Sequence, residues 1–267
     1  MIVTELIGGI GNQLFQYAAG RQLAYLNHAD LKVNISGFND YNLRNYALEH
    51  FNITATVAAE ADLAEVQTYE EKSFHVDPTF FSLPDRTMIK GYWQSEQYFL
   101  AIRDMLLTEL AIKTPPSVAN QRLINEIMAV NSISIHIRRG DYVSDMATFK
   151  VHGICELDYY LQCIHIIAQK VTNPHFFVFS DEPEWAIANL KTGFATTYVT
   201  HNSPEQHYED LRLMSLCKHH IIANSSFSWW AAWLNTHTEK IVLAPQKWFR
   251  REVPDASDLI PESWLKI

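Results

Sequence analysis

Residues 8–18 read GGIGNQLFQYA and stand between a short apolar run, residues 2–6, and a stretch with apolar side chains at helical spacing, residues 13–26. A second apolar run follows at residues 31–35. A buried strand, a glycine turn, a helix and a second strand make one βαβ unit. The chain therefore begins with the building block of a parallel α/β sheet.

The turn in this unit holds Gly8, Gly9 and Gly11, followed by Asn12. Glycine permits a positive φ and lets the backbone approach a ligand closely, and an asparagine offers both a hydrogen-bond donor and an acceptor. The dinucleotide fingerprint G-x-G-x-x-G is matched only in part, because Leu14 stands where its third glycine is expected and no acidic residue takes the ribose role. An ordinary dehydrogenase is therefore disfavoured.

Composition narrows the class of protein further. The chain has 267 residues, of which 48% are hydrophobic, enough for one large domain or two of ordinary size. Its formal net charge of -9 disfavours nucleic acid as a partner. Its three cysteines lack metal-type spacing and are interpreted as buried free thiols. With no leader peptide and no transmembrane segment in the sequence, we expect a soluble cytoplasmic protein.

Apolar runs and amphipathic stretches alternate most clearly in the second half of the chain. Strands are predicted at residues 132–137, 175–180, 196–200, 219–223 and 240–244, and helices at 156–171, 183–190, 204–217 and 226–234. This order predicts a parallel sheet covered by helices. Earlier, residues 87–93 read as a strand leading into a helix over 95–110, while residues 39–81 are irregular. The linker candidate is KTPPS, residues 113–117, with a helix through Val130 beyond it. We expect an N-terminal domain of residues 1–130 and a C-terminal domain of residues 131–267.

Ligands of such sheets bind beyond the carboxyl ends of the strands. Arg138 and Arg139 follow the strand at 132–137, and a guanidinium fork matches phosphate oxygens bidentately. Adjacent residues on a strand point to opposite faces, so one of the two is expected to face the ligand. Solvated or ion-paired arginines are the alternative.

Two further loops carry polar residues. Asp181 and Glu182 follow the strand at 175–180, where they fit a divalent metal, a guanine edge bound by one carboxylate, or a helix cap before Pro183. Ser225 and Ser226 follow the strand at 219–223, where a helix N-terminus favours phosphate. The tryptophans that come next are expected to pack that helix on the sheet.

Five blocks of this chain resemble the bacterial α-1,2-fucosyltransferase family, in the same order and over nearly the whole sequence. They are GGIGNQLFQYA, KGYWQSEQYF, HIRRGDY, FVFSDE and HNSPEQHYEDLRLMSLCKHHIIANSSFSWWAAWL. The resemblance implies a GT-B architecture, with two Rossmann-like domains facing a cleft. It also implies inverting transfer of fucose from GDP-β-L-fucose to the 2-hydroxyl of a galactose-containing acceptor, with an N-terminal acceptor domain, a C-terminal donor domain, and no metal or other cofactor.

The resemblance also assigns individual residues. It implies that Arg138 contacts the donor β-phosphate and that Asn12 lies in the cleft. The other positions that it assigns to donor binding are His136 and Asp181 for the guanosine, Ser225 and Ser226 for the phosphates, and Gly9 and Gly11 for the backbone at the cleft. Asp141 is the carboxylate nearest Arg138 in sequence, and it serves either as the general base or as an acid that orients an arginine.

Three questions stay open at this point. The family often has two aspartates after FS, whereas this chain has Asp181 and Glu182, so the role of Glu182 is not assigned. A different GDP-sugar donor fits the same residues. A non-catalytic carbohydrate- or nucleotide-binding protein also accounts for the glycines and aromatic residues, although not for the arginines, acids and serines that follow successive strands.

Overall fold

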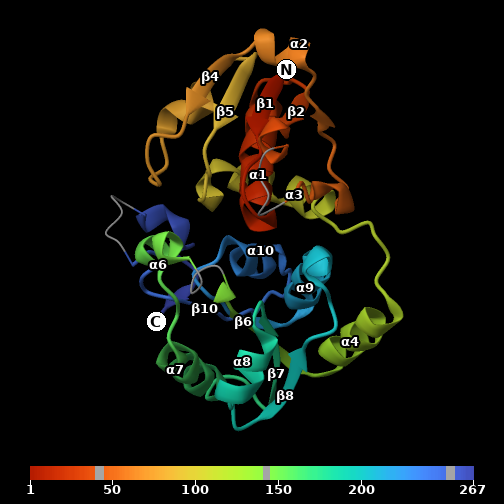
Figure 1. Ribbon diagram of the computed structural model, residues 1–267, viewed down its shortest axis with the longest axis vertical. Helices are drawn as coiled ribbons and strands as arrows, with labels where there is room; N and C mark the ends of the chain where they lie inside the picture. Colours follow the sequence, from red (N-terminus) through yellow and green to blue (C-terminus); the bar gives the residue numbers. More distant parts are fainter. Residues whose placement is uncertain (40–44, 141–144, 251–255) are drawn as a thin grey trace. The chain divides into compact units, whose positions relative to one another are not determined.

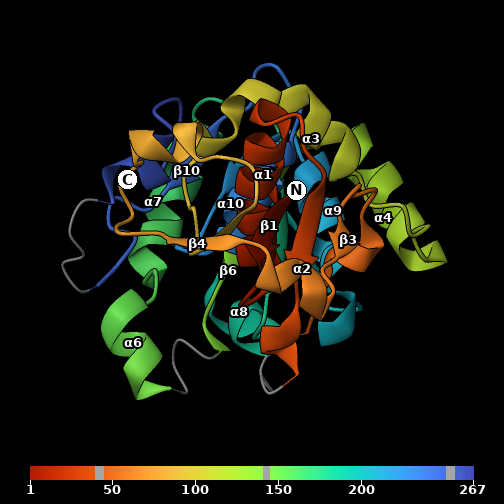
Figure 2. The same cartoon turned by 90° about the horizontal axis from the view of Figure 1, so that it is seen from above.

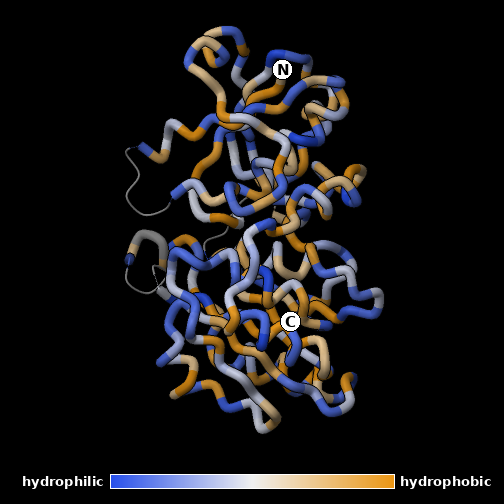
Figure 3. Tube along the Cα trace, turned by 90° about the vertical axis from the view of Figure 1, so that its right-hand side faces the viewer, coloured by the Kyte–Doolittle hydropathy of each residue, from blue (hydrophilic) through white to orange (hydrophobic). Residues whose placement is uncertain are grey.

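The computed structural model describes residues 1–39, 45–140, 145–250 and 256–267, and it divides into two compact units. Unit 1 comprises Met1–Thr114 and Pro254–Pro261, and unit 2 comprises Pro115–Val253 and Glu262–Ile267 (Figure 1). Each unit carries one parallel sheet with helices, so the predicted α/β class is confirmed. In both units apolar and polar segments alternate along the chain (Figure 3).

The units separate after Thr114, inside the predicted linker and not after residue 130. Helix α4 (Val118–Ala129) therefore belongs to unit 2, because its apolar face packs against α9 (His207–Leu216) and β6 (Asn131–Ile137). Helical periodicity identifies the apolar face of α4 but not the domain that covers this face. A C-terminal segment, Pro254–Pro261, also returns to unit 1, which the sequence did not predict.

The sheet of unit 1 has the strand order β3-β2-β1-β5-β4. Its strands are β1 (Ile2–Glu5), β2 (Leu31–Asn34), β3 (Thr56–Val57), β4 (Gln67–Glu70) and β5 (Thr87–Lys90). Its helices are α1 (Ile10–Leu26), α2 (Glu60–Ala64) and α3 (Arg103–Glu109). Helix α1 packs against β1 and β2 (Figure 2). The strand order reverses between β1 and β5, which makes this point the expected place for a ligand.

The sequence predictions for unit 1 were accurate at β1, β2 and β5, wrong at one helix, and absent where two further strands lie. The helix expected over residues 95–110 is α3 preceded by two short 3-10 turns, Glu96–Tyr98 and Leu100–Ile102. Strands β3 and β4 lie in the region that we left unassigned, and their side chains are mostly exposed. An edge strand of this kind lacks the apolar run by which a strand is found.

The sheet of unit 2 has the order β11-β10-β9-β6-β7-β8 and reverses between β6 and β9. Besides β6, its strands are β7 (Pro174–Ser180), β8 (Ala195–Val199), β9 (His219–Ile221), β10 (Val242–Ala244) and β11 (Leu265–Lys266). Besides α4 and α9, its helices are α6 (Met146–His152), α7 (Leu157–Ala168), α8 (Pro183–Asn189) and α10 (Ser226–Leu234). The five predicted strands and the helices between them are confirmed, while α6 and β11 were missed.

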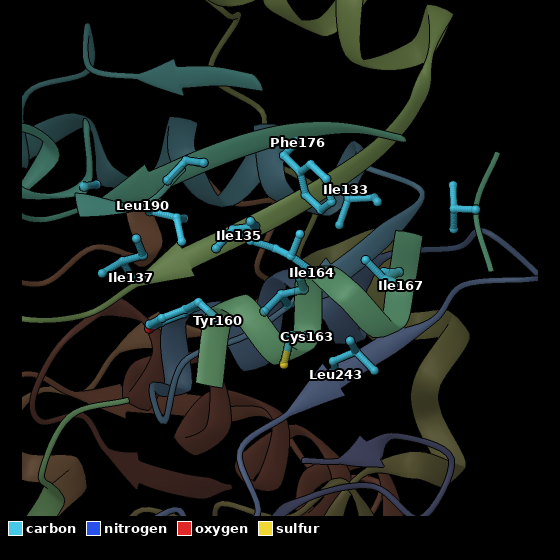
Figure 4. Close-up of a cluster of buried hydrophobic side chains, with 14 residues drawn as sticks. Ile133, Ile135, Ile137, Tyr160, Cys163, Ile164, Ile167, Phe176, Leu190 and Leu243 are labelled. Carbon is cyan, nitrogen blue, oxygen red and sulfur yellow. The ribbon is translucent and has the colours of Figure 1, made fainter. Parts of the chain in front are cut away.

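The core of unit 2 follows from the alternation along β6. Ile133, Ile135 and Ile137 point to one face and pack against α7, where Tyr160 and Ile164 recur at helical spacing (Figure 4). Burial of each such side chain contributes about 1.5–3 kcal/mol. The alternate residues, His136 among them, must therefore lie on the opposite face of the sheet.

Helix α10 contributes three tryptophan side chains to the interior of unit 2. Trp229, Trp230 and Trp233 are all buried, as we expected from their spacing.

Cys163 and Cys217 are buried free thiols, also as expected, whereas Cys155 is partly exposed. In the part of the chain that the structure describes, no helix is both long and apolar enough to span a bilayer.

Candidate functional site

Arg138 and Asp181 meet at the carboxyl ends of β6 and β7. The strands pair so that Ile137 stands opposite Ser180, which makes the next residues neighbours. Nη1 of Arg138 lies 2.8 Å from Oδ2 of Asp181, and Oδ1 of Asp181 accepts a hydrogen bond from the backbone N–H of Arg139 at 2.9 Å. Asp181 therefore fastens the loop after β6 to the loop after β7 and fixes the Arg138 side chain.

Gly140 is needed for the same contact. A Cβ atom at this position would stand 2.5 Å from Oδ2 of Asp181, closer than nonbonded atoms approach. Glycine thus lets the backbone of the RRG turn close over the carboxylate. The predicted partner in this turn, Asp141, lies outside the residues that the structure describes.

Arg139 has different partners from Arg138. Its Nε lies 2.9 Å from Oε2 of Glu182, and its guanidinium carbon lies 3.9 Å from the centre of the Trp185 ring. An ion pair and a cation–π contact together hold this side chain against α8. Glu182, whose role the sequence left open, is therefore the partner of Arg139.

The start of α8 differs from the capping alternative. Its N-cap residue is Glu182 and not Asp181 or Ser180, although Pro183 occupies the first helical turn as expected. The Ser180 hydroxyl instead accepts a hydrogen bond from the Glu182 backbone N–H at 3.0 Å. The Asp181 side chain instead contacts the two arginine residues, through the Arg138 guanidinium and the Arg139 backbone N–H.

His136 lies on the opposite face of β6 from the isoleucine core. The ring is 5% exposed, and its centre lies 5.4 Å from that of Phe227 on α10. Burial, and secondly the charge of Arg138, lower the pKa of His136 to about 3, so the imidazole is neutral at physiological pH. Within the described part of the chain, Nδ1 of His136 has no hydrogen-bond partner. An unsatisfied buried nitrogen at a strand end is a candidate ligand contact.

The N-terminus of α10 follows β9, the neighbour of β6. Ser225 is its N-cap residue, is 7% exposed and makes no side-chain capping bond, and Ser226 opens the helix. The Asn224 side chain has a structural role, because its Nδ2 donates to the carbonyls of His152 at 2.9 Å and Trp248 at 3.1 Å. The backbone N–H groups of the first turn and the two serines thus form the anion-favouring part of this loop.

In the glycine turn of unit 1, the positive φ that we expected of three glycines occurs at one of them. Among its three glycines only Gly8 has a positive φ, of 74°, while Gly9 is the N-cap of α1 with φ -75°. Gly11 and Asn12 lie inside the first turn of α1, which begins at Ile10 and not at residue 13. Helical backbone requires a negative φ, so the freedom of glycine is used at Gly8 alone.

Two buried glutamines, which the sequence analysis missed, hold this turn in shape. Nε2 of Gln13 donates to the carbonyls of Gly8 and Asn45, both at 2.9 Å. Oε1 of Gln16 accepts from the Ile7 N–H at 3.0 Å, and its Nε2 donates to the Gly91 carbonyl at 3.0 Å. Residues 13–20 of this helix are all buried. Two glutamines in such a stretch could have predicted these contacts, because buried amides need hydrogen-bond partners.

No group of three His, Cys, Asp or Glu side chains suited to a metal ion occurs among the residues that the structure describes. Asp181 and Glu182, the acidic pair after β7, are each paired with an arginine.

Two solved structures of similar fold are the fucosyltransferase NodZ from Bradyrhizobium and the apo form of POFUT1. NodZ aligns with a TM-score of 0.54 at 13% identity over 86% of this chain and 91% of its own. POFUT1 aligns with a TM-score of 0.50 at 10% identity over 91% of this chain and 97% of its own. The two parallel α/β units therefore have the GT-B fold.

The model of Glycosyl transferase family 11 matches residues 1–267, and the chain belongs to this family. It is 33% identical to the α-1,2-colitosyltransferase of Escherichia coli, with 100% of this chain and 99% of that protein covered. It is 32% identical to the O-antigen biosynthesis glycosyltransferase WbnK of Escherichia coli, with 98% and 99% covered. Galactoside α-(1,2)-fucosyltransferase 2 of Hylobates lar is 24% identical, with 91% and 71% covered.

Proposed function

We propose that this glycosyltransferase moves L-fucose from GDP-β-L-fucose to the 2-hydroxyl of a galactose-containing acceptor, with inversion at the anomeric carbon. The observation that carries the proposal is the place of Arg138, at the carboxyl end of β6 beside the point where the strand order of unit 2 reverses. There the guanidinium is held by Asp181, and the N-terminus of α10 follows the next strand.

The chemistry requires these groups. The bond between the anomeric carbon and the β-phosphate oxygen breaks, so negative charge grows on GDP while positive charge grows on the sugar. Arg138 and the first turn of α10 stabilise that negative charge more strongly in the transition state than in the ground state. The acceptor hydroxyl oxygen forms the new bond from the opposite face and loses its proton, for which Asp141 is the proposed acceptor, with Asn12 as a further hydrogen-bonding group at the reaction centre.

His136 supports nucleoside recognition. Its imidazole is neutral, so it presents a hydrogen-bonding nitrogen without adding charge beside Arg138. We assign it to the guanosine, and Ser225 and Ser226 to the phosphates.

Metal is not needed in this scheme. Arg138 neutralises the leaving group, and the carboxylates of Asp181 and Glu182 are already paired with arginines. Neither carboxylate is then available to carry an ion.

The names of the relatives favour a deoxyhexose donor and leave two candidates. Transfer of fucose fits the mammalian α-(1,2)-fucosyltransferases, and transfer of colitose, the 3-deoxy form of fucose, fits the Escherichia coli colitosyltransferase. We place fucose first because the mammalian relative and the fold neighbour NodZ are both named as fucosyltransferases.

A GDP-release screen tests the proposal. GDP-fucose and GDP-colitose are each offered with lactose, a second free disaccharide containing β-galactose and a lipid-linked galactose-containing repeat, and the product linkage is assigned by NMR. We expect GDP release only when donor and acceptor are both present, and an α-1,2 linkage. If GDP is released with GDP-colitose and an acceptor but not with GDP-fucose and any acceptor, the donor is colitose and not fucose. If the protein binds GDP but releases none with any pair of donor and acceptor, the protein is not an enzyme of this kind.

A further inference from the structure

The strand order of unit 1 also reverses, between β1 and β5, and this point carries a second cluster of polar side chains. Asn12 follows β1, and Gln94 follows β5. Nε2 of Gln94 donates to Oδ1 of Asn12 at 2.9 Å, so a pair of amides bridges the reversal point. A Cβ atom at Gly8 would stand 2.7 Å from Nδ2 of Asn12, which shows that the Asn12 amide lies directly against the glycine turn.

The backbone after β5 is held in unusual conformations. Gly91 has φ 152°, and Trp93 has φ 56°, a value that side-chain-bearing residues seldom adopt. Strain of this kind persists only where the surroundings impose it, and it concentrates at functional sites. Tyr92, between these two residues, is 38% exposed.

A single carboxylate imposes this conformation. Oε2 of Glu71 accepts a hydrogen bond from the Tyr92 backbone N–H at 2.7 Å, and Oε1 accepts one from the Trp93 N–H at 2.9 Å. A Cβ atom at Gly91 would stand 2.4 Å from the Cβ of Glu71, so glycine is needed for this approach. The Glu71 side chain therefore holds the turn that presents Tyr92 and Gln94.

Trp93 anchors the turn from the other side. It is 1% exposed, and its ring centre lies 5.1 Å from that of Phe80 and 5.3 Å from that of Tyr98. The aromatic cluster and the Glu71 carboxylate thus hold the turn at two points, and elements fixed by packing are the usual supports of binding residues.

We propose that Tyr92, Gln94 and Asn12 bind the acceptor sugar in unit 1, with Glu71 as the residue that positions their turn. An exposed aromatic ring matches the apolar C–H face of galactose, and amides match its hydroxyls as both donors and acceptors. The three side chains proposed to bind the sugar are uncharged, which suits a neutral ligand, whereas the arginines of unit 2 suit phosphate. The identity of the sugar as a galactoside rests on the proposed function.

The test combines kinetics with a binding measurement that does not need turnover. Tyr92→Ala and Gln94→Ala should each raise the KM for the acceptor about tenfold, as expected for one lost polar or stacking contact. The affinity for GDP, measured by calorimetry, should stay at the parent value. Tyr92→Phe keeps the ring and should restore most of the acceptor affinity. Tyr25→Ala removes another exposed tyrosine, 50% exposed against 38% for Tyr92, at the far end of α1 and serves as the control.

Glu71 is tested through its two hydrogen bonds. Glu71→Gln keeps one accepting oxygen and should raise the acceptor KM less than Glu71→Ala, while neither variant changes GDP affinity. Saturation-transfer NMR of the parent with β-galactosides separates the two possible failures. If the parent neither binds nor turns over a galactoside, the proposed function is wrong. If the parent does both, and Tyr92→Ala and Gln94→Ala bind galactosides as it does, the acceptor site is elsewhere.

Discussion

Arg138 and Asp181 form an ion pair across neighbouring strands, with Nη1 and Oδ2 2.8 Å apart. The two residues are 43 positions apart in sequence, and the parallel register of β6 and β7 places them side by side. Both oxygens of Asp181 accept hydrogen bonds from the RRG turn. This geometry makes Asp181 the residue that aims Arg138, and it changes what each substitution should do.

Arg138→Lys should keep the positive charge and lose the planar fork. We expect donor affinity to fall modestly and kcat to fall about 100-fold, because the fork stabilises charge that develops in the transition state. Arg138→Ala should lower kcat further without unfolding the protein. Steady-state kinetics and thermal melts on both variants make the measurement, and a folded Arg138→Ala enzyme with parental kcat would contradict the mechanism.

Arg139→Ala is the contrasting variant. It removes the ion pair with Glu182 and the contact with the Trp185 ring. We therefore expect a lower Tm, with a smaller loss of kcat than Arg138→Ala causes. An equal loss of kcat in two equally stable variants would place both arginines at the leaving group.

Asp181→Asn separates aiming of Arg138 from reading of the guanine. GMP carries the guanine but no β-phosphate. If Asp181 acts on Arg138, the affinity for GMP should stay within about twofold of the parent while kcat falls about tenfold or more. Glu182→Gln is the matched control and should lower Tm with little change in kcat. A parallel loss of GMP and GDP affinity in calorimetry would return Asp181 to the guanine.

Chelation tests the role given to arginine. Because Arg138 and the N-terminus of α10 are assigned the leaving-group charge, activity in EDTA should stay close to that of the untreated enzyme. The assay is GDP release before and after dialysis, with Mg²⁺ or Mn²⁺ added back. Activity that is lost with EDTA and returns with either metal would contradict the assignment of the leaving-group charge to Arg138 and α10.

Asp210 on α9 should make stability depend on pH. Burial, and secondly the charge of Glu209, raise the pKa of Asp210 from 3.8 to about 6, although Asn202 donates a hydrogen bond to it at 2.7 Å. Between about pH 4 and pH 6 the folded protein therefore binds more protons than the unfolded chain, so this group lowers stability as pH rises. Above pH 6 the full destabilisation, at most about 3 kcal/mol, is present.

Asp210→Asn removes that titration and still accepts the bond from Asn202. We expect the variant to have a higher Tm than the parent at pH 8 and an equal Tm near pH 4. Thermal melts of both proteins across this range make the measurement. A difference in Tm that is constant with pH would mean that Asp210 does not titrate in this window.

The sequence by itself determined the parts of this protein that depend on neighbouring residues. The alternation of apolar runs and amphipathic stretches predicted the main strands and helices of unit 2, the glycines before α1 predicted a turn, and the tryptophans of α10 predicted a packed helix. The order of the five sequence blocks predicted the family. Each of these signals lies within a few residues, where periodicity and backbone preference act.

Only the tertiary structure decided which distant residues contact one another. It joined Asp181 to Arg138 and Glu182 to Arg139, gave α4 to unit 2, and brought Glu71 onto the turn at Trp93. It also limited the positive φ in the first turn to Gly8. Residues 20 to 45 positions apart become neighbours only through strand order and register, and these depend on how whole faces pack, which no local pattern records.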